Sequence, residues 1–331
     1  MQFVLANKFL VNFMRMTIDL HDKRLGDVII HNPRDPVDIG IIGAPFDGST
    51  RGRPGARFAP RCIRESLYSM TTFVNDVDLE NIRIGDFGDI ETSFSSVERN
   101  KEEIYSAVRE ALRKCKRIIV IGGDHSITEP AFKAFSESRE SVGLIVFDAH
   151  LDLRDLKAGT VSSGTVMEDI LKNLGNKIKP ANLVYIGIRD FVNPKYYVEK
   201  ARRLGVKIYK AQDILYSTPE TFSALLEDAI SRASDGTNGV YISFDADVID
   251  CSFAPGLNAP SPLGLRPEHV VQALTFFGSK DVGALDITEV SPPYDPTGNT
   301  CKIVSACIIG FIASSAKVLM ETPHKVTRTD Q

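Results

Sequence analysis

Residues 143–152 read Gly-Leu-Ile-Val-Phe-Asp-Ala-His-Leu-Asp, an apolar run that ends in three polar side chains. Short apolar runs bounded by loops are typical of strands buried on both faces, which occur in parallel sheets. Side chains alternate faces along an extended chain, so Asp148, His150 and Asp152 project together if the extended backbone continues through them. The stretch therefore predicts a buried parallel strand with metal-ligand groups at its carboxyl end.

Two further runs have the same construction. Residues 117–126 read Arg-Ile-Ile-Val-Ile-Gly-Gly-Asp-His-Ser, and residues 240–247 read Val-Tyr-Ile-Ser-Phe-Asp-Ala-Asp. In open parallel sheets, ligands bind beyond the carboxyl ends of the strands, where the strand order reverses. We therefore expect His125, Asp245 and Asp247 to converge in space with the first cluster.

The three clusters together have the composition of a metal site. Carboxylates and imidazoles without cysteine favour Mn²⁺, and less strongly Zn²⁺, Fe²⁺ or Co²⁺. A single Asp after a strand is ordinarily a helix cap or a turn residue, but three such clusters favour metal binding. They hold more ligands than one ion needs, which suits a pair of ions about 3.5–4 Å apart. The expected ligands are His125, Asp148, His150, Asp152, Asp245 and Asp247.

The composition is that of a globular enzyme rather than of a nucleic-acid or membrane protein. The chain has 331 residues, 43% of them hydrophobic and 25% charged, enough for one large α/β domain. A net charge of −4 gives no reason to expect nucleic acid or an anionic membrane as a partner. Five dispersed cysteines without a Cys-x-x-Cys pair predict reduced thiols and a cytoplasmic protein.

Two apolar segments near the ends have other expected roles than membrane insertion. Met1–Leu20 is interrupted by charges and has no clear cleavage site, which favours an amphipathic helix that packs on the body or on a neighbouring subunit. Ile303–Leu319 is shorter than a comfortable membrane span and contains Lys317. We expect it to be the buried last helix.

Strand and helix patterns alternate along the chain, which predicts a mainly parallel sheet with helices on both faces. Apolar residues recur at helical spacing in residues 96–115 and 219–233. We expect an N-terminal extension at 1–36 that packs on the body, a single catalytic domain at 37–321 and a tail at 322–331. The strand candidates are 37–42, 82–84, 117–121, 143–147, 182–186, 206–209, 239–244 and 282–287.

Two loops add information about the site. Pro45–Pro60 is rich in Gly and Arg but lacks the Gly-Lys-Ser/Thr ending of a P-loop, so we expect a fixed loop near the mouth of the site. Glu289 follows the last strand candidate. Near two metals its carboxylate becomes a candidate partner for a cationic substrate, because a guanidinium forks naturally onto a carboxylate.

Four motifs together resemble the ureohydrolase (arginase/agmatinase) superfamily, from about Gly40 to Ala316. They are Gly-Gly-Asp-His-Ser, Asp-Ala-His-Leu-Asp, Ser-Phe-Asp-Ala-Asp-Val-Ile-Asp and Glu-Val-Ser-Pro-Pro-Tyr-Asp. Residues 53–58 (Arg-Pro-Gly-Ala-Arg-Phe), residues 253–256 (Phe-Ala-Pro-Gly) and the lack of Asn-Pro after Val290 look most like agmatinase.

The resemblance implies a three-layer α/β/α fold with an eight-stranded parallel sheet, two Mn²⁺ ions, and a homotrimer or homohexamer. It assigns Asp148 and Asp245 to both ions as bridging ligands. The remaining ligands would be His125 and Asp152 for one ion and His150 and Asp247 for the other.

The resemblance also implies a reaction. Asp152 would hold the attacking hydroxide and pass its proton to the leaving amine, and Glu289 would bind the substrate guanidinium. The guanidino C–N bond of agmatine would be cleaved to urea and putrescine, a step of polyamine biosynthesis. Arginine and other guanidino compounds remain open as substrates, and Arg189 is a candidate group for an α-carboxylate.

The chain departs from the family pattern at three places. Ser163 stands where a proton-shuttling His is usual, and we place it with Glu289 among the residues expected to face the substrate. A serine does not titrate near neutral pH and cannot act as that acid or base. Cys251 and Asn258-Ala259 are the other departures. A metal-binding relative that has lost catalysis and serves as a regulator is therefore the alternative to an enzyme.

Overall fold

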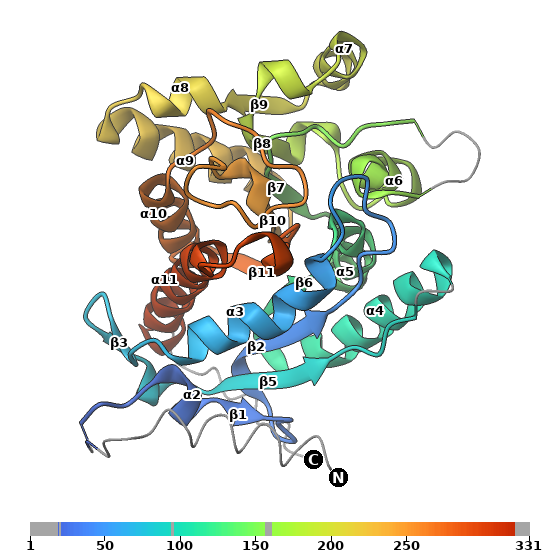
Figure 1. The fold of residues 1–331 in the computed structure, drawn as a ribbon. Coiled ribbons are helices and arrows are strands. Elements are labelled where there is room, and N and C mark those ends of the chain that lie inside the picture. Colours follow the sequence, from blue (N-terminus) through green and yellow to red (C-terminus); the bar gives the residue numbers. More distant parts are fainter. Residues whose placement is uncertain (1–18, 20, 94–95, 156–160, 322–331) are drawn as a thin grey trace.

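A computed structural model describes residues 19, 21–93, 96–155 and 161–321 of the chain. The helix expected within residues 1–20, apart from Asp19, and the tail expected at 322–331 lie outside them. The centre of the fold is one nine-stranded sheet in which every neighbouring pair of strands is parallel (Figure 1). The predicted α/β/α class is confirmed.

All eight predicted strands have a counterpart in the sheet, although the strand predicted at 82–84 begins only at Ile84 and continues to Asp89. The sheet has one strand more than expected. The additional strand is β1, whose Ile30 and His31 pair with Gly85 and Asp86 of β5 at the edge of the sheet. Two residues carry no periodic pattern, so only the tertiary structure reveals this strand. The strands in spatial order are β1 (Ile30–His31), β5 (Ile84–Asp89), β2 (Val37–Ala44), β6 (Cys115–Gly122), β11 (Val282–Thr288), β10 (Val240–Asp245), β7 (Gly143–Phe147), β8 (Leu183–Ile188) and β9 (Lys207–Lys210).

Alternating side chains of the sheet enter two separate hydrophobic cores, one on each face. On β6, Ile119 and Ile121 pack into one core, and Ile118 and Val120 into the other. The first core is covered by α3 (Ala59–Tyr68), α8 (Ala211–Leu215), α9 (Pro219–Ser234), α10 (Pro267–Gly278) and α11 (Asn299–Glu321). The second is covered by α4 (Val97–Leu112), α5 (Thr128–Ser136), α6 (Val166–Asn173) and α7 (Lys195–Leu204).

The predicted buried last helix is confirmed as α11. Its length and composition would suffice to cross a membrane, but 61% of its most apolar window is buried inside the protein. It packs against α10 and α3, and its apolar side chains are buried in the first core.

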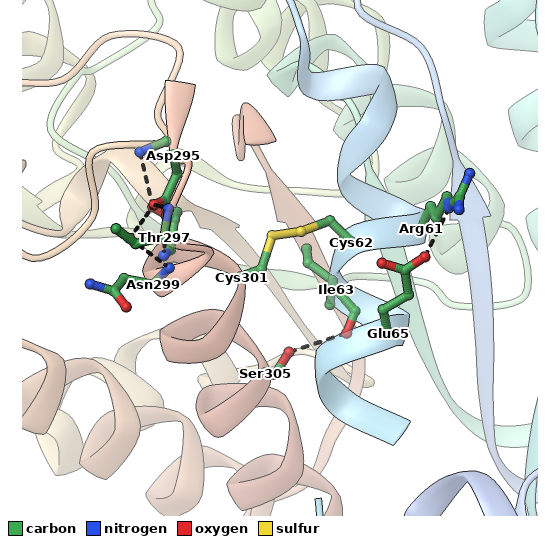
Figure 2. The surroundings of a disulfide bond; sticks show 11 residues. Arg61, Cys62, Ile63, Glu65, Asp295, Thr297, Asn299, Cys301 and Ser305 are labelled. Carbon is green, nitrogen blue, oxygen red and sulfur yellow. Dashed lines mark hydrogen bonds and ion pairs between the residues drawn. A yellow bond between two sulfur atoms is a disulfide. The ribbon is translucent and has the colours of Figure 1, made fainter. Parts of the chain in front are cut away.

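One disulfide contradicts the expectation that all five cysteines are reduced. Cys62 of α3 is bonded to Cys301 of α11, as Figure 2 shows. The Cα atoms of the two cysteines lie 6.2 Å apart. Cys115, Cys251 and Cys307 are free. The pairing joins residues 239 positions apart. It depends on the packing of α3 against α11, which cysteine spacing does not reveal.

Candidate metal centre

The four central strands of the sheet carry the predicted site. β6, β11, β10 and β7 are adjacent, and their carboxyl ends therefore meet at one edge (Figure 1). His125 follows β6, Asp148 follows β7, and Asp245 ends β10. Parallel strands are joined by long crossover connections, so the three segments are far apart in the sequence. The adjacent positions of their strands in the sheet bring them together.

The first candidate group surrounds the imidazole of His125. Its Nδ1 lies 3.0 Å from Asp152 Oδ2, 3.2 Å from Asp245 Oδ2 and 3.4 Å from Asp148 Oδ2. Ligand atoms of these four residues all lie within 4.8 Å of one another. Three of the side chains are buried and Asp152 is half-buried. This arrangement contains the ligands predicted for one ion, and their role stays a prediction.

The second candidate group surrounds His150. Its Nδ1 lies 2.9 Å from Asp247 Oδ2 and 3.3 Å from Asp148 Oδ1. Asp148 thus faces both groups, one oxygen to each, as a bridging ligand would. Asp245, the other predicted bridge, belongs to the first group only.

The carboxylates are aimed by short turns rather than by an extended strand. β7 ends at Phe147, and Asp152 has a φ of +46°, so the expectation of extended backbone through Asp152 is wrong. Asp148 Oδ1 instead accepts the backbone N–H of His150 at 2.5 Å. Asp245 Oδ1 accepts the N–H of Asp247 at 2.8 Å. Such turns satisfy backbone donors at the strand end and leave the second carboxylate oxygen, together with a remaining lone pair of the first, for a metal.

A hydrogen-bonded chain behind His125 sets the orientation of its ring. Nε2 lies 3.0 Å from Ser243 Oγ, which in turn donates to Asp286 Oδ1 at 2.8 Å. Because the hydroxyl proton goes to the carboxylate, Ser243 accepts the Nε2–H, and Nδ1 faces the carboxylate group, where it carries a proton or binds a metal. Tyr241 also donates to Asp286, at 2.8 Å.

The sequence reasoning missed Ser243 and Asp286, although period-2 alternation could have found the first. Ser243 lies two positions before Asp245 on β10 and therefore on the same face of the strand. Asp286 pairs with Ser243 in the register of β10 and β11. No local pattern marks that pairing.

The crowded charges shift the pKa values of the cluster. Burial and neighbouring carboxylates raise the pKa of Asp148 to about 6 and that of Asp245 well above its usual range. Burial lowers the pKa of His125, but three carboxylates raise it well above its usual value. Burial disfavours the charged forms of Asp247 and His150. Their attraction for each other outweighs this effect, so the pKa of His150 rises to about 12 and that of Asp247 falls to about 2. Without metal, protons therefore supply the positive charge that the carboxylates require.

Glu289 stands beside the first group with one oxygen free. Its Oε1 accepts the backbone N–H of His125 at 2.8 Å, while Oε2 is buried and without a hydrogen-bond partner among the described residues. Burial, followed by the charges of Asp245 and Asp124, raises the pKa of Glu289 well above its usual range. A buried carboxylate with an unsatisfied oxygen is a site for a cationic donor.

Two other candidate residues have defined positions. Ser163 is buried at the start of the 3₁₀ turn Ser163–Thr165, and its N–H donates to Ser49 O at 3.0 Å. Arg189 is also buried, and its guanidinium donates to the backbone carbonyls of residues 247–249 at 2.8–3.1 Å. Arg189 therefore braces the end of β10. Its Nε is buried without a hydrogen-bond partner among the described residues, and its role toward a substrate carboxylate stays a prediction.

The residues present fit a pair of divalent ions. Asp148 Oδ2 is buried and accepts no hydrogen bond among the described residues, although it lies beside His125 Nδ1. The donor set consists of carboxylate oxygens and imidazole nitrogens without thiolate, which suits Mn²⁺.

A parallel α/β/α sheet with two clusters of Asp and His at its carboxyl edge defines a protein with a candidate binuclear metal centre. Residues 37–313 match the family model described as the arginase family, and the chain belongs to that family of metal-dependent hydrolases. The expectation of the ureohydrolase superfamily is thereby confirmed.

The similar proteins match most of the length of the chain. A formimidoylglutamase from Halalkalibacterium halodurans is 32% identical over 301 residues, which are 89% of this chain and 93% of the relative. The crystal structure of formimidoylglutamase from Bacillus subtilis, at 24% identity, superposes with a TM-score of 0.84 over 94% of this chain and 96% of that one. Trypanosoma cruzi formiminoglutamase, solved with Mn²⁺, has 25% identity and a TM-score of 0.80 over 89% of this chain and 99% of that one.

Proposed function

We propose that this chain hydrolyses a C–N bond of a guanidino or formimidoyl group, using two Mn²⁺ ions. The observation that carries the proposal is the buried Oε2 of Glu289 beside the His125 group, which has no hydrogen-bond partner in the part of the chain that the structure describes. Both substrate groups contain an amidine carbon whose nitrogens are cationic donors. A carboxylate at this position binds such a cation and places the amidine carbon next to the metal cluster.

The predicted ligands would hold the ions in two overlapping sets. His125, Asp152 and Asp245 would serve one ion, His150 and Asp247 the other, and Asp148 both. When bound, such a pair supplies a water nucleophile that is ionised near neutral pH and neutralises charge in the transition state.

Protein side chains would bind the substrate and move the proton. Glu289 would hold the amidinium with its free oxygen, while its other oxygen stays on the His125 N–H. Asp152, the most exposed carboxylate of the first group, would take the proton of the attacking water and deliver it to the leaving nitrogen. Ser163 would face the substrate without moving a proton.

The proposal also concerns which amidine compound is the substrate. Agmatine, the prediction from the sequence motifs, would yield urea and putrescine. The formimidoylglutamase names of the relatives instead suggest a formimidoyl amino acid, which would yield formamide and the free amine. A homotrimer or homohexamer in the cytoplasm stays the proposed state of the protein.

A substrate panel tests the proposal. Mn²⁺-loaded protein is incubated with agmatine, arginine, 4-guanidinobutyrate and N-formimidoylglutamate, and urea, formamide and amine are measured. We expect turnover of at least one amidine and its loss in Asp245→Asn. No product from any of them, with Mn²⁺ tightly bound, would overturn the enzyme proposal in favour of the regulatory alternative.

A further inference from the structure

A cavity of about 370 Å³ lies at the amino edge of the sheet, opposite the candidate metal centre. It is lined where three adjacent strands begin, at Arg117 of β6, Gly239 before β10 and Gly283 of β11. Arg139, which follows α5, and Leu319 of α11 close its sides. Pockets for small ligands measure roughly 300–1,000 Å³, so the cavity has room for a small metabolite.

Arg139 is fixed in this cavity with one edge of its guanidinium unused. Its Nη1 donates to Phe135 O at 2.6 Å, and its guanidinium carbon lies 3.7 Å from the centroid of the Phe135 ring. A Cβ atom placed on Gly239 would lie 3.0 Å from Nε, and one on Gly283 would lie 3.7 Å from Nη2. Nε and Nη2 donate to no residue that the structure describes. Together they form an edge that can hold both oxygens of a carboxylate.

Asp281 brings a negative charge to the same cavity. The turn before it is held by Arg117, whose guanidinium donates to Gly278 O at 2.6 Å and to Lys280 O at 2.8 Å. Within the described ranges, the Asp281 carboxylate accepts no hydrogen bond and forms no ion pair. Burial lowers the pKa of Arg139 and that of Arg117, and the charge of Asp281 opposes this effect on both. Asp281 is therefore within electrostatic reach of both guanidinium groups.

The charges around the cavity do not balance. Lys116 is neutralised by an ion pair with Asp38 at 2.8 Å. Arg117 and Arg139 form no ion pair with any described carboxylate, and only the single charge of Asp281 stands against them. A diamine would be repelled by the two arginines, and a simple anion would be repelled by Asp281. The complementary ligand contains both signs of charge and is negative overall.

We infer that this cavity binds a small acidic amino acid, with its α-carboxylate on the free edge of Arg139 and its ammonium group on Asp281. The second carboxylate of such a ligand supplies the remaining negative charge and lies toward Arg117. The site is separate from the metal centre, because the two lie at opposite edges of the sheet. The inference goes beyond the proposed function and does not depend on it.

Isothermal titration calorimetry of Mn²⁺-loaded protein tests the class of ligand. L-Glutamate, L-glutamine and glutarate share one carbon chain, but glutamine lacks the second carboxylate and glutarate lacks the ammonium group. We expect glutamate to bind at least about 10-fold more tightly than either, because each comparison removes one charge-assisted contact. No binding of glutamate, or equal binding of all three compounds, would overturn the inference.

Two variants test the assigned contacts. Arg139→Gln should weaken glutamate binding about 10- to 100-fold, the effect of one charge-assisted hydrogen bond. Asp281→Asn should remove the preference for glutamate over glutarate. The controls Arg99→Gln and Asp213→Asn change exposed residues of α4 and α8 and should bind as wild type does. Circular dichroism verifies folding. Wild-type affinity in Arg139→Gln, or a preference kept in Asp281→Asn, would contradict these contacts.

A metal-site variant separates the cavity from the metal centre. Asp148→Ala changes a predicted metal ligand and leaves the amino edge of the sheet intact, so it should bind glutamate with wild-type affinity. That result would support the site even in a protein that hydrolyses nothing. Loss of glutamate binding in Asp148→Ala, with wild-type binding in Arg139→Gln, would place the ligand at the metal centre and overturn the inference.

Discussion

Glu289 Oε1 accepts the backbone N–H of His125 at 2.8 Å, so the residue after β11 is bound to a predicted metal ligand after β6. Glu289 has a φ of +64°, and its own N–H donates to Gly123 O at 2.8 Å. These two bonds hold an uncommon backbone conformation and fix the Glu289 carboxylate against the backbone of a predicted metal ligand. The candidate substrate anchor and the candidate metal centre are therefore built as one unit.

Glu289→Gln should lower kcat/KM roughly 10- to 100-fold while the protein keeps its Mn²⁺, because an amide binds a cation more weakly than a carboxylate does. Steady-state kinetics and metal analysis of the same preparation check the two parts. Wild-type activity in Glu289→Gln would contradict the anchoring role.

Asp148→Ala should remove both ions and all activity, because Asp148 faces both candidate groups. Asp247→Ala should remove one ion. Asp245→Ala tests the predicted second bridge: loss of both ions supports bridging, whereas loss of one matches its place in the His125 group alone. Mn²⁺ per chain is measured by elemental analysis, with circular dichroism to verify folding. Two ions retained in Asp148→Ala would contradict the shared ligand.

Mn²⁺ affinity should rise with pH. In the metal-free protein the pKa of His150 is raised to about 12 and that of Asp148 to about 6, so protons occupy ligand atoms that a metal must take over. Binding then releases protons and weakens as the pH falls. Calorimetry in two buffers of different ionisation enthalpy counts the released protons, and an affinity independent of pH would contradict the ligand set.

The same shift predicts how metal-free stability depends on pH. The stabilising contribution of protonated His150 is fully present below its unfolded pKa of 6.5 and is lost as the pH rises toward about 12. The melting temperature of metal-free protein should therefore fall on the alkaline side more than that of Mn²⁺-loaded protein. Differential scanning calorimetry of both forms compares them.

Ser163→His should raise turnover if the missing shuttle limits the rate, because an imidazole titrates near neutral pH and a hydroxyl does not. The rate should also gain a new dependence on pH. Ser163→Ala is the control and should leave the pH profile unchanged. A rate for Ser163→His equal to that of wild type at every pH would exclude this role.

Cys62→Ser or Cys301→Ser should destabilise the protein by about 2–4 kcal/mol, because the disulfide restricts the unfolded chain across a long loop. Thermal unfolding of each variant, and of wild type under reduction, measures the loss. Cys251→Ser changes a free cysteine and serves as the control. Equal melting temperatures for oxidised and reduced wild type would contradict a stabilising disulfide.

Local patterns in the chain sufficed to predict the eight main strands and a mainly parallel sheet with helices on both faces. They also identified the six Asp and His residues that the structure brings together as candidate metal ligands. Strands that are buried on both faces appear in the sequence as continuous apolar runs, so they can be recognised without knowledge of their neighbours. The helices predicted at 96–115 and 219–233 are confirmed as α4 and α9, since amphipathic spacing is likewise local.

What depends on strand order and helix packing could not be predicted from local patterns. The support of His125 by Ser243 and Asp286 depends on the register between β10 and β11. The disulfide depends on the packing of α3 against α11. Periodicity records which face a side chain takes within its own element, whereas these contacts join elements whose relative positions are set by burial of the whole core.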